Sequence, residues 1–403
     1  MPIWSFSWYK EVDKGSKFNG KLPTELWAMI IDFIVVPLRY PYLYCEPETF
    51  PQYEALFRSV DASDKIPFLD DWKRIRAVCK QWKHFAGVAP CFFLQKQRWP
   101  KYSKPIIHQD TSIVFIYSKT NSRLSMECIA HLKENLTTLA LGSSTPPYID
   151  ALDVLLEDPS MFPNLRCLSI HSSRTTRPFW KVIQDEFPNL ISLTVRSDAY
   201  GSPGRYVLKN LEILSISSLA GFELVCPSLK HLCYHSIQWT QAREFILRHA
   251  HQLQSFIGFF PVPPNREENI WSSVFPNLVL CDCSMRYSPP RAVRPPGHPL
   301  RHFRLTADYS GWKTEAVMRE IDGYGVSGIE SIHVNMNKMR YGTADALRAR
   351  CRRRGIRLVE IVDGKPPLIP PPRPMKDYIK TAFRFCTIPC WWPCLEFDAR
   401  YYD

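Results

Sequence analysis

The sequence has 403 residues and a formal net charge of +12, with 45% hydrophobic, 22% charged and 13% aromatic residues. This composition is too apolar for a disordered chain, and the length predicts one large elongated domain or two domains. The basic residues are spread along the chain except for a run at 348–354, which reads as a solvated helix face or as a nuclear-localisation or phosphate-binding patch.

No segment predicts a membrane span or a secretory signal. The apolar stretch at 26–37 is too short to cross a bilayer, and residues 1–17 lack a continuous apolar run. The 13 cysteines lie mostly at apolar positions, which favours buried, reduced thiols over a disulfide framework. We therefore expect a cytoplasmic or nuclear protein without a membrane partner.

Two amphipathic segments near the N-terminus predict helices. In the first, at 21–36, Pro23 suits the first helical turn and Glu25 suits the positive end of the helix dipole. The second lies at 71–82. The apolar residues at helical spacing are Leu26, Ile30, Phe33 and Ile34 in the first segment, and Ile75, Val78, Cys79 and Trp82 in the second.

The Leu-Pro-x-Glu-Leu opening and the Val-Cys-x-x-Trp ending resemble an F-box, the helical module that docks on the adaptor subunit of SCF ubiquitin ligases. The resemblance implies a module over 21–99 that binds this adaptor and, through it, cullin. The adaptor-binding residues that it implies are Leu22, Pro23, Glu25, Leu26, Ile30, Val78, Cys79 and Trp82. An insert at 37–70 replaces the family's short connection, but a long loop closes at little entropic cost. Without the resemblance, the segments read as two packed capping helices.

A short phrase recurs through the middle of the chain. Phe-Pro-Asn-Leu begins at Phe162, Phe187 and Phe275, and a variant begins at Cys226. Each phrase leads into the spacing L-x-x-L-x-L. Nine candidate copies of that spacing begin at Leu136, Leu165, Leu190, Leu211, Leu229, Leu253, Leu278, Leu300 and Ile329.

The last two apolar positions of each copy are two residues apart, so they lie on one face of a strand. Strands stacked side by side can bury that face in a continuous core, with the return segments outside. The pattern resembles the leucine-rich-repeat family and implies an α/β fold, an irregular leucine-rich-repeat solenoid with a parallel sheet over 100–364. Only Asn337 matches the family's usual Asn or Cys after the strand, so we expect uneven curvature.

Helices are also predicted between and after the repeats. Residues 240–250 place Phe245, Ile246 and His249 at helical spacing. Residues 343–354 also have their apolar side chains at helical spacing, and Gly355 is a suitable residue to follow a helix. Residues 356–362 then alternate like a last strand. The remainder predicts an N-terminal extension at 1–20 and, at 365–403, a proline-rich linker and tail.

The alternate residues of each predicted strand are expected to face solvent on the inner side of the sheet. Several are basic, which predicts that this face binds an acidic or phosphorylated segment of a target protein. These candidate substrate-binding residues are His171, Arg196, His231, His235, His302, Arg304 and His333. The alternative is that they are ordinary polar strand residues.

No metal, cofactor or catalytic site is predicted. Cys226, His231, Cys233 and His235 have zinc-binding side chains, but the last three alternate along one strand and no Cys-x-x-Cys pair occurs there. For Cys386, Cys390 and Cys394 in the tail, lipidation or metal binding stays an alternative to a packed or disordered segment. The chain has no phosphate-binding glycine loop, nucleophile elbow or His-Glu-x-x-His helix.

These patterns together predict a non-catalytic substrate receptor of an SCF-type E3 ubiquitin ligase. The module would hold the adaptor, and the repeats would hold an unidentified target protein, with the chain a monomer within a hetero-complex. We expect no nucleic-acid partner. The alternatives are a leucine-rich-repeat scaffold without a ubiquitin role and a basic nucleic-acid-associated protein, which salt-dependent binding would reveal.

Overall fold

The fold is known from a computed structural model of the chain. It describes residues 42, 45–58, 91–94, 107, 109–116, 122–142, 151–171, 178–196, 203–219, 221–235, 239–258, 270–282, 295–305, 328–335 and 341–361. All of these residues belong to one structural unit, 32–367.

Twelve strands form one large sheet in which each strand pairs in parallel with its neighbours, and their order in the sheet follows the chain. The strands are β1 (Cys91–Leu94), β2 (Ile113–Ile116), β3 (Thr138–Leu141), β4 (Cys167–Ile170), β5 (Ser192–Val195), β7 (Ile213–Ile216), β9 (His231–Tyr234), β10 (Ser255–Ile257), β11 (Leu280–Asp282), β12 (His302–Leu305), β13 (Ser331–Val334) and β14 (Arg357–Glu360). Strands β6 (Arg205–Val207) and β8 (Glu223–Val225) form a separate parallel pair. The prediction of an α/β protein with a parallel sheet is confirmed.

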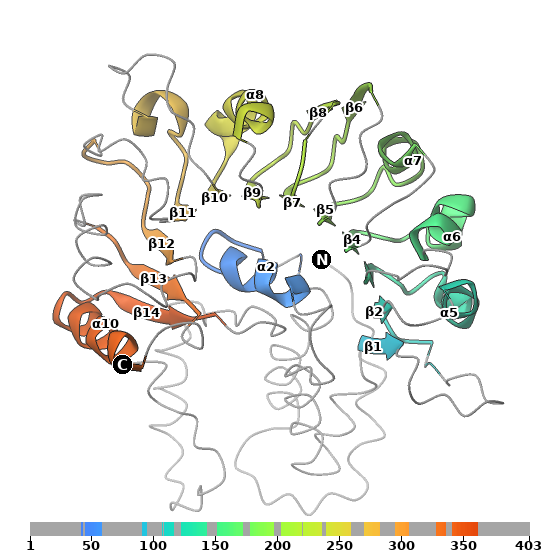
Figure 1. The fold of residues 1–403 in the computed structure, drawn as a ribbon, viewed down its shortest axis with the longest axis horizontal. Coiled ribbons are helices and arrows are strands. Elements are labelled where there is room, and N and C mark those ends of the chain that lie inside the picture. Colours follow the sequence, from blue (N-terminus) through green and yellow to red (C-terminus); the bar gives the residue numbers. More distant parts are fainter. Residues whose placement is uncertain are drawn as a thin grey trace, which may run out of the picture. The chain divides into compact units, whose positions relative to one another are not determined.

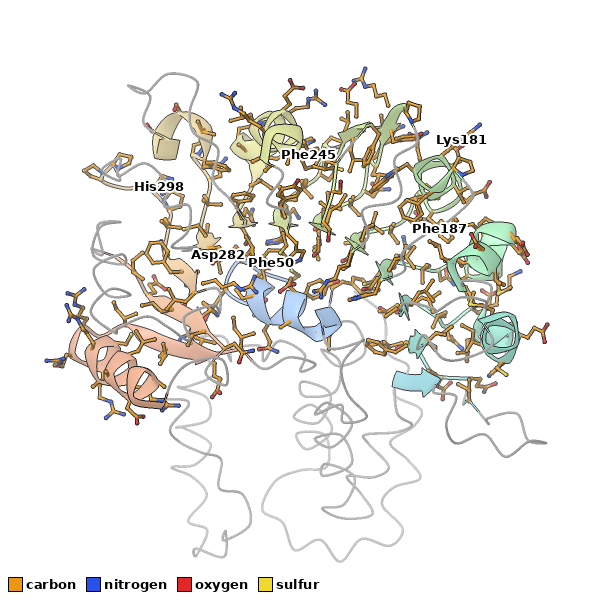
Figure 2. All side chains as sticks on the ribbon, viewed as in Figure 1. Phe50, Lys181, Phe187, Phe245, Asp282 and His298 are labelled. Atoms are coloured by element: carbon orange, nitrogen blue, oxygen red, sulfur yellow. The ribbon has the colours of Figure 1, made fainter. Side chains whose placement is uncertain are left out.

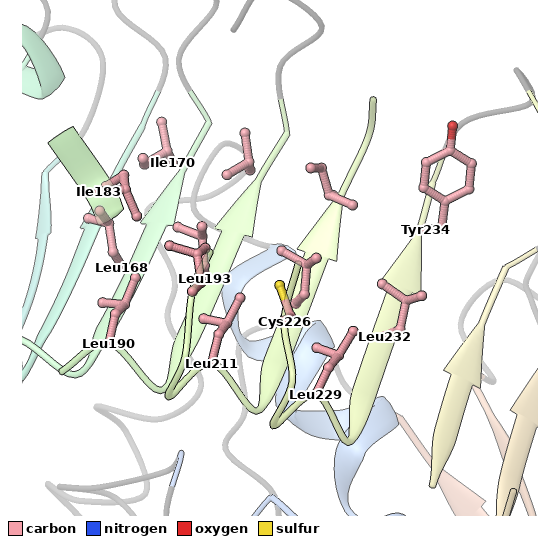
Figure 3. Packing of buried hydrophobic residues seen from close by; sticks show 14 of the residues in the cluster. Leu168, Ile170, Ile183, Leu190, Leu193, Leu211, Cys226, Leu229, Leu232 and Tyr234 are labelled. Carbon is pink, nitrogen blue, oxygen red and sulfur yellow. The ribbon is translucent and has the colours of Figure 1, made fainter. Parts of the chain in front are cut away.

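The nine predicted repeat copies correspond to nine strands, from β3 to β13. Equivalent positions stack on one another, so that Leu168 lies beside Leu193, Leu193 beside Leu214 and Leu214 beside Leu232. All four side chains are buried in one continuous apolar cluster (Figure 3). The spacing in the sequence therefore predicts which strand side chains enter this cluster, which we call the outer core.

The sheet extends beyond the repeats at both ends. Strands β1 and β2 precede the first copy without its spacing, and β1 begins at Cys91, inside the segment predicted to be the 21–99 module. At the other end the predicted last strand is present as β14. The preceding helix ends at Arg353. Gly355 follows it, and its φ of +67° lets the Ile356 amide reach the Cys351 carbonyl at 2.9 Å.

Helices lie on the outer side of the curved sheet, which Figure 1 shows for α5, α6, α7, α8 and α10. The outer segments are α5 (Ser122–Ile129), η6 (Ala130–Leu132), α6 (Ala151–Glu157), η7 (Pro159–Met161), α7 (Phe179–Glu186), α8 (Trp239–His249), η8 (Ala250–Gln252), η9 (Ile270–Val274) and α10 (Tyr341–Arg353). Their apolar faces meet the leucines of the strands, as Ile183 of α7 does. The predicted helices at 240–250 and 343–354 are confirmed as α8 and α10.

Each Phe-Pro-Asn-Leu phrase forms a tight turn before its strand. The Leu165 amide donates to the Phe162 carbonyl at 3.2 Å, and the Leu278 amide donates to that of Phe275 at 3.3 Å. Proline favours the second position of such a turn because its φ is fixed. The phenylalanine side chains are buried in the outer core, so the phrase both turns the chain and fills the interior.

The asparagine of the phrase links neighbouring repeats. Asn164 Nδ2 donates to the Glu134 carbonyl at 2.9 Å, Asn210 to that of Pro188 at 2.9 Å and Asn277 to that of His251 at 2.7 Å. Asn135 and Ser228 make the same bond to Gln109 and Lys209. These bonds tie five of the turns to the segment before each of them, at the end of the chain segment that enters the strand.

In the described part of the chain, the following cysteines are free thiols: Cys45, Cys128, Cys167, Cys226, Cys233, Cys281 and Cys351. Within the same part, no helix has the length and apolarity needed to cross a membrane.

Candidate functional site

The inner face of the sheet is covered by a helix from the insert, α2 (Phe50–Arg58) (Figure 1). A turn leads into it, in which the Glu46 amide donates to Thr49 Oγ1 at 2.9 Å and the Phe50 amide donates to the Glu46 carbonyl at 2.8 Å. Pro51 suits the first turn, where no helical acceptor faces its nitrogen. Phe50, Tyr53 and Glu54 are spaced i, i+3, i+4 and lie on the face turned toward the strands.

Glu54 is the centre of a buried ion cluster. Arg196 Nη2 donates to its Oε1 at 2.9 Å, and Arg304 Nη2 donates to its Oε2 at 3.2 Å. His235 Nε2 lies 3.4 Å from Oε1. The side chains of Glu54 and Arg304 are only 1% and 3% exposed, whereas those of Arg196 and His235 are 18% and 30% exposed. The cluster therefore has a buried side at Arg304 and an accessible side at Arg196 and His235.

The charges of the cluster support one another. Burial lowers the pKa of His235, but neighbouring Cys233 and Glu54 outweigh it and raise that pKa to about 9. Burial also lowers the pKa of Arg304, but Glu54 and Asp282 raise it, so the guanidinium stays charged. Asp282 lies directly across from Arg304 in the adjacent strand β11. Three cations thus surround two carboxylates.

Two aromatic side chains of α2 flank this cluster. The Phe50 ring lies 5.2 Å from the His231 ring, and Tyr53 donates its hydroxyl hydrogen to Ser192 Oγ at 2.7 Å. Burial raises the pKa of the Tyr53 phenol, and the Cys167 thiol, 3.3 Å from its oxygen, adds to the shift. Figure 2 shows Phe50 and Asp282 together at the inner side of the sheet, next to α2.

The expectation of a solvent-facing inner surface is wrong for most of the candidate residues. His171, His231, His302, Arg304 and His333 are buried. Only Arg196 and His235 keep substantial exposure, and only these two and Arg304 meet at Glu54. The reason is that the inner positions also carry apolar side chains, and α2 packs on them. These are Ile113, Phe115, Ala140, Cys167, Ile213, Cys233, Ile257 and Leu280.

The other histidines take part in separate polar contacts. His302 Nδ1 lies 2.9 Å from Ser331 Oγ, which lies 2.9 Å from His333 Nε2. His231 Nδ1 lies 2.9 Å from Ser255 Oγ. Burial lowers the pKa of His231 and of His333 to about 3 each, with smaller effects of Lys230 on the first and of His302 and Arg304 on the second. Both rings are therefore neutral near pH 7.

The sequence interpretation missed Glu54, because the insert was treated as a connection. The signal was present: Phe50, Tyr53, Glu54 and Phe57 recur at helical spacing, with one acid among three aromatic residues. Asp282 was also missed, since an acidic residue in a buried strand has no local pattern that distinguishes it from a loop residue.

The predicted adaptor-binding residues Leu22, Pro23, Glu25, Leu26, Ile30, Val78, Cys79 and Trp82 lie outside the described residues, as do Cys386, Cys390 and Cys394. The basic run at 348–354 is described and lies at the end of α10, where Arg348, Arg352, Arg353 and Arg354 are exposed. Positive charge is favourable at the C-terminus of a helix, and Arg348 also pairs with Asp345 at 2.8 Å.

Glu54, Cys233 and His235 place three possible metal ligands within 4.8 Å of one another. However, both oxygens of Glu54 already accept hydrogen bonds from guanidinium groups. A divalent cation would add its charge beside two arginines, so the cluster suits an anion better than a metal. The four residues with zinc-binding side chains, Cys226, His231, Cys233 and His235, do not come together either. Cys226 packs in the outer core and Cys233 in the inner one.

Cys233, His235 and Glu54 are also the residue types of a catalytic triad, with a cysteine nucleophile, a histidine base and an acid. In such a set the acid and the nucleophile bind different nitrogens of the imidazole. Here Cys233 Sγ and Glu54 Oε1 both approach Nε2 of His235, at 3.3 and 3.4 Å, and the cysteine is fully buried. The arrangement holds charge in place and does not present a nucleophile.

The fold and the site together define an α/β protein whose parallel sheet holds, on its inner face, a helix of the same chain that is bound there through a glutamate. Comparison of the chain with protein-family models, with curated proteins and with solved structures finds no match.

Proposed function

We propose that this protein is a non-catalytic substrate receptor of an SCF-type E3 ubiquitin ligase, in which an F-box-like module precedes an irregular leucine-rich-repeat solenoid. The observation that carries the proposal is the sheet itself. Its strands follow chain order. Nine of them bury the first two apolar positions of the L-x-x-L-x-L spacing in one core, and seven of these bury all three. Leucine-rich repeats stack in this way, and the Leu22–Leu26 and Val78–Trp82 phrases precede them.

In this proposal the chain contributes binding and geometry. The module would bind the adaptor, and through it cullin, while the sheet side would bind a target protein. Holding the target's lysines near a ubiquitin-charged enzyme raises their effective concentration, and the transfer chemistry belongs to other subunits. The partners are thus proteins, in the cytoplasm or the nucleus, and no cofactor is required.

A leucine-rich-repeat scaffold without a ubiquitin role is the alternative. The ion cluster of Glu54, Arg196, His235 and Arg304 favours this reading as much as the first, because it is formed between the insert and the sheet and does not involve the adaptor phrase. The two functions differ only in whether the adaptor is bound.

The test is a pull-down of the full chain, scored for the SCF adaptor and for cullin. We expect wild type to retain both, and Leu22→Ala/Pro23→Ala to lose at least about tenfold, because removing buried apolar contacts from a small interface weakens it strongly. Glu223→Gln on exposed β8 is the matched control and should behave as wild type. Failure of wild type to retain the adaptor would leave the scaffold function in its place.

A further inference from the structure

Helix α2 forms a layer that is separate from the core of the sheet. The apolar side chains between the strands and the outer helices form one cluster, and those between the strands and α2 form another. Among the described residues, the backbone hydrogen bonds of α2 stay within the helix and its first turn. Helix α2 is therefore joined to the sheet by side-chain contacts, whereas the strands are joined to one another by backbone pairing.

Arg196, Arg304 and His235 bring three positive groups to the inner face, against the carboxylates of Glu54 in α2 and Asp282 in β11. Glu54 supplies one carboxylate to Arg196, Arg304 and His235. Arg304 Nη1 is buried and has no acceptor among the described residues. Arg196 and His235 are the exposed side of the cluster, so an anion from outside would meet them first.

From these observations we infer that the inner face is the target-binding surface and that α2 occupies it as an internal ligand. The inference rests on the proposed function as a protein-binding receptor. The partner segment is a helix with two aromatic residues three positions apart, followed at once by a carboxylate. It takes the place of Phe50, Tyr53 and Glu54, with its carboxylate between Arg196 and Arg304. Binding of the target thus requires α2 to leave the face.

The probe is a fluorescein-labelled peptide with the sequence of residues 46–58, titrated into the full-length protein and followed by fluorescence anisotropy. A face that is mostly occupied lowers the apparent affinity of a competing ligand by the fraction of time it is free. We therefore expect Phe50→Ala/Glu54→Gln, which weakens the internal helix, to bind the peptide at least about tenfold more tightly than wild type.

Two controls define what is recognised. The charge-matched variant Glu223→Gln, on the exposed strand β8, should bind the peptide as weakly as wild type. A peptide in which the glutamate at position 54 is glutamine should lose about tenfold in affinity for the double variant, because the carboxylate that accepts from both guanidinium groups is then missing. Equal binding by wild type and the double variant, or equal binding of both peptides, would overturn the inference.

A second measurement covers the case in which the double variant does not fold. In wild type, amide hydrogen exchange in α2 should be faster than in β7 and β9, because a separate layer opens without unfolding the sheet. Exchange of α2 amides only at the rate of the strands would mean a permanently fixed helix and would refute the inference.

The outcome is independent of the adaptor. If the peptide competes with α2 but wild type retains no adaptor, the inner face binds partners in a scaffold. If the adaptor is retained but the peptide does not compete, the receptor function stands and the target must bind elsewhere.

Discussion

At the scale of single residues, Glu54 joins parts of the chain that are far apart in sequence. Its two hydrogen-bonded arginines lie 142 and 250 residues away. Taking a carboxylate out of water is costly unless opposite charges and donors replace the water, and here Arg196 and Arg304 do so. Glu54 therefore acts as the link between the insert and two distant strands.

Replacing Glu54 should lower the stability of the fold. Glu54→Gln removes the carboxylate that accepts a hydrogen bond from buried Arg304 and leaves it only the charge of neighbouring Asp282, so we expect a loss of at least about 2 kcal/mol in the free energy of unfolding, measured in urea. Glu223→Gln is the control, because its pair with Arg248 is more than 40% exposed on both sides. It should cost less than about 1 kcal/mol.

A double variant tests whether the loss of unfolding free energy in Glu54→Gln comes from the buried charge of Arg304. Glu54→Gln/Arg304→Met removes both partners, so it should be less destabilised than the sum of the two single variants. Strict additivity would mean that Arg304 and Glu54 do not stabilise each other.

At the scale of elements, the Phe-Pro-Asn-Leu phrase explains how each repeat begins. Its phenylalanine enters the outer core, its proline favours the turn, and its asparagine bonds to the preceding repeat. The asparagine bonds therefore join neighbouring copies where the chain enters the strand.

The row of bonds contains its own comparison. Asn189 stands in the same phrase as Asn164 but makes no side-chain hydrogen bond among the described residues, whereas Asn164 donates to Glu134. We expect Asn164→Ala and Asn277→Ala each to lose about 0.5–1.5 kcal/mol of unfolding free energy. Asn189→Ala should change it by less than about 0.5 kcal/mol. Equal losses at all three positions, in urea titrations, would count against a role for the bond.

At the scale of the whole unit, burial of histidines should make stability depend on pH. The pKa values of His231 and His333 are lowered to about 3, so below pH 6.5 the unfolded chain takes up protons that the folded chain does not. Their contribution to stability is complete above pH 6.5 and is lost progressively as the pH falls toward 3. His235 has the opposite sign, since its raised pKa of about 9 adds stability that is complete below 6.5 and lost as the pH rises through 9.

These opposite contributions predict a maximum of stability near pH 6.5. Urea unfolding at several pH values checks this prediction. His231→Gln/His333→Gln should flatten the acid side of the curve, and His235→Gln the alkaline side. An acid limb of unchanged slope in the first variant would show that these two rings do not cause it.

Much of this fold could be read from the sequence because its signals are local. The L-x-x-L-x-L spacing located nine strands, and the three-to-four spacing located α8 and α10. Gly355 marked the end of a helix, since a positive φ there favours glycine. Such patterns depend only on which side of a strand or helix a residue occupies, so each short segment carries its own evidence.

Only the tertiary structure decided what the inner face contacts. The basic residues identified from the sequence do lie on the inner side of the strands, but the expectation that they face solvent was wrong for most of them. The segment that covers them is set by where the insert packs. That position is fixed by contacts between Glu54 and residues far along the chain. Spacing along a sequence fixes the face of an element, whereas the partner of that face is set by the long-range packing that buries Ile213 and Leu280 under α2.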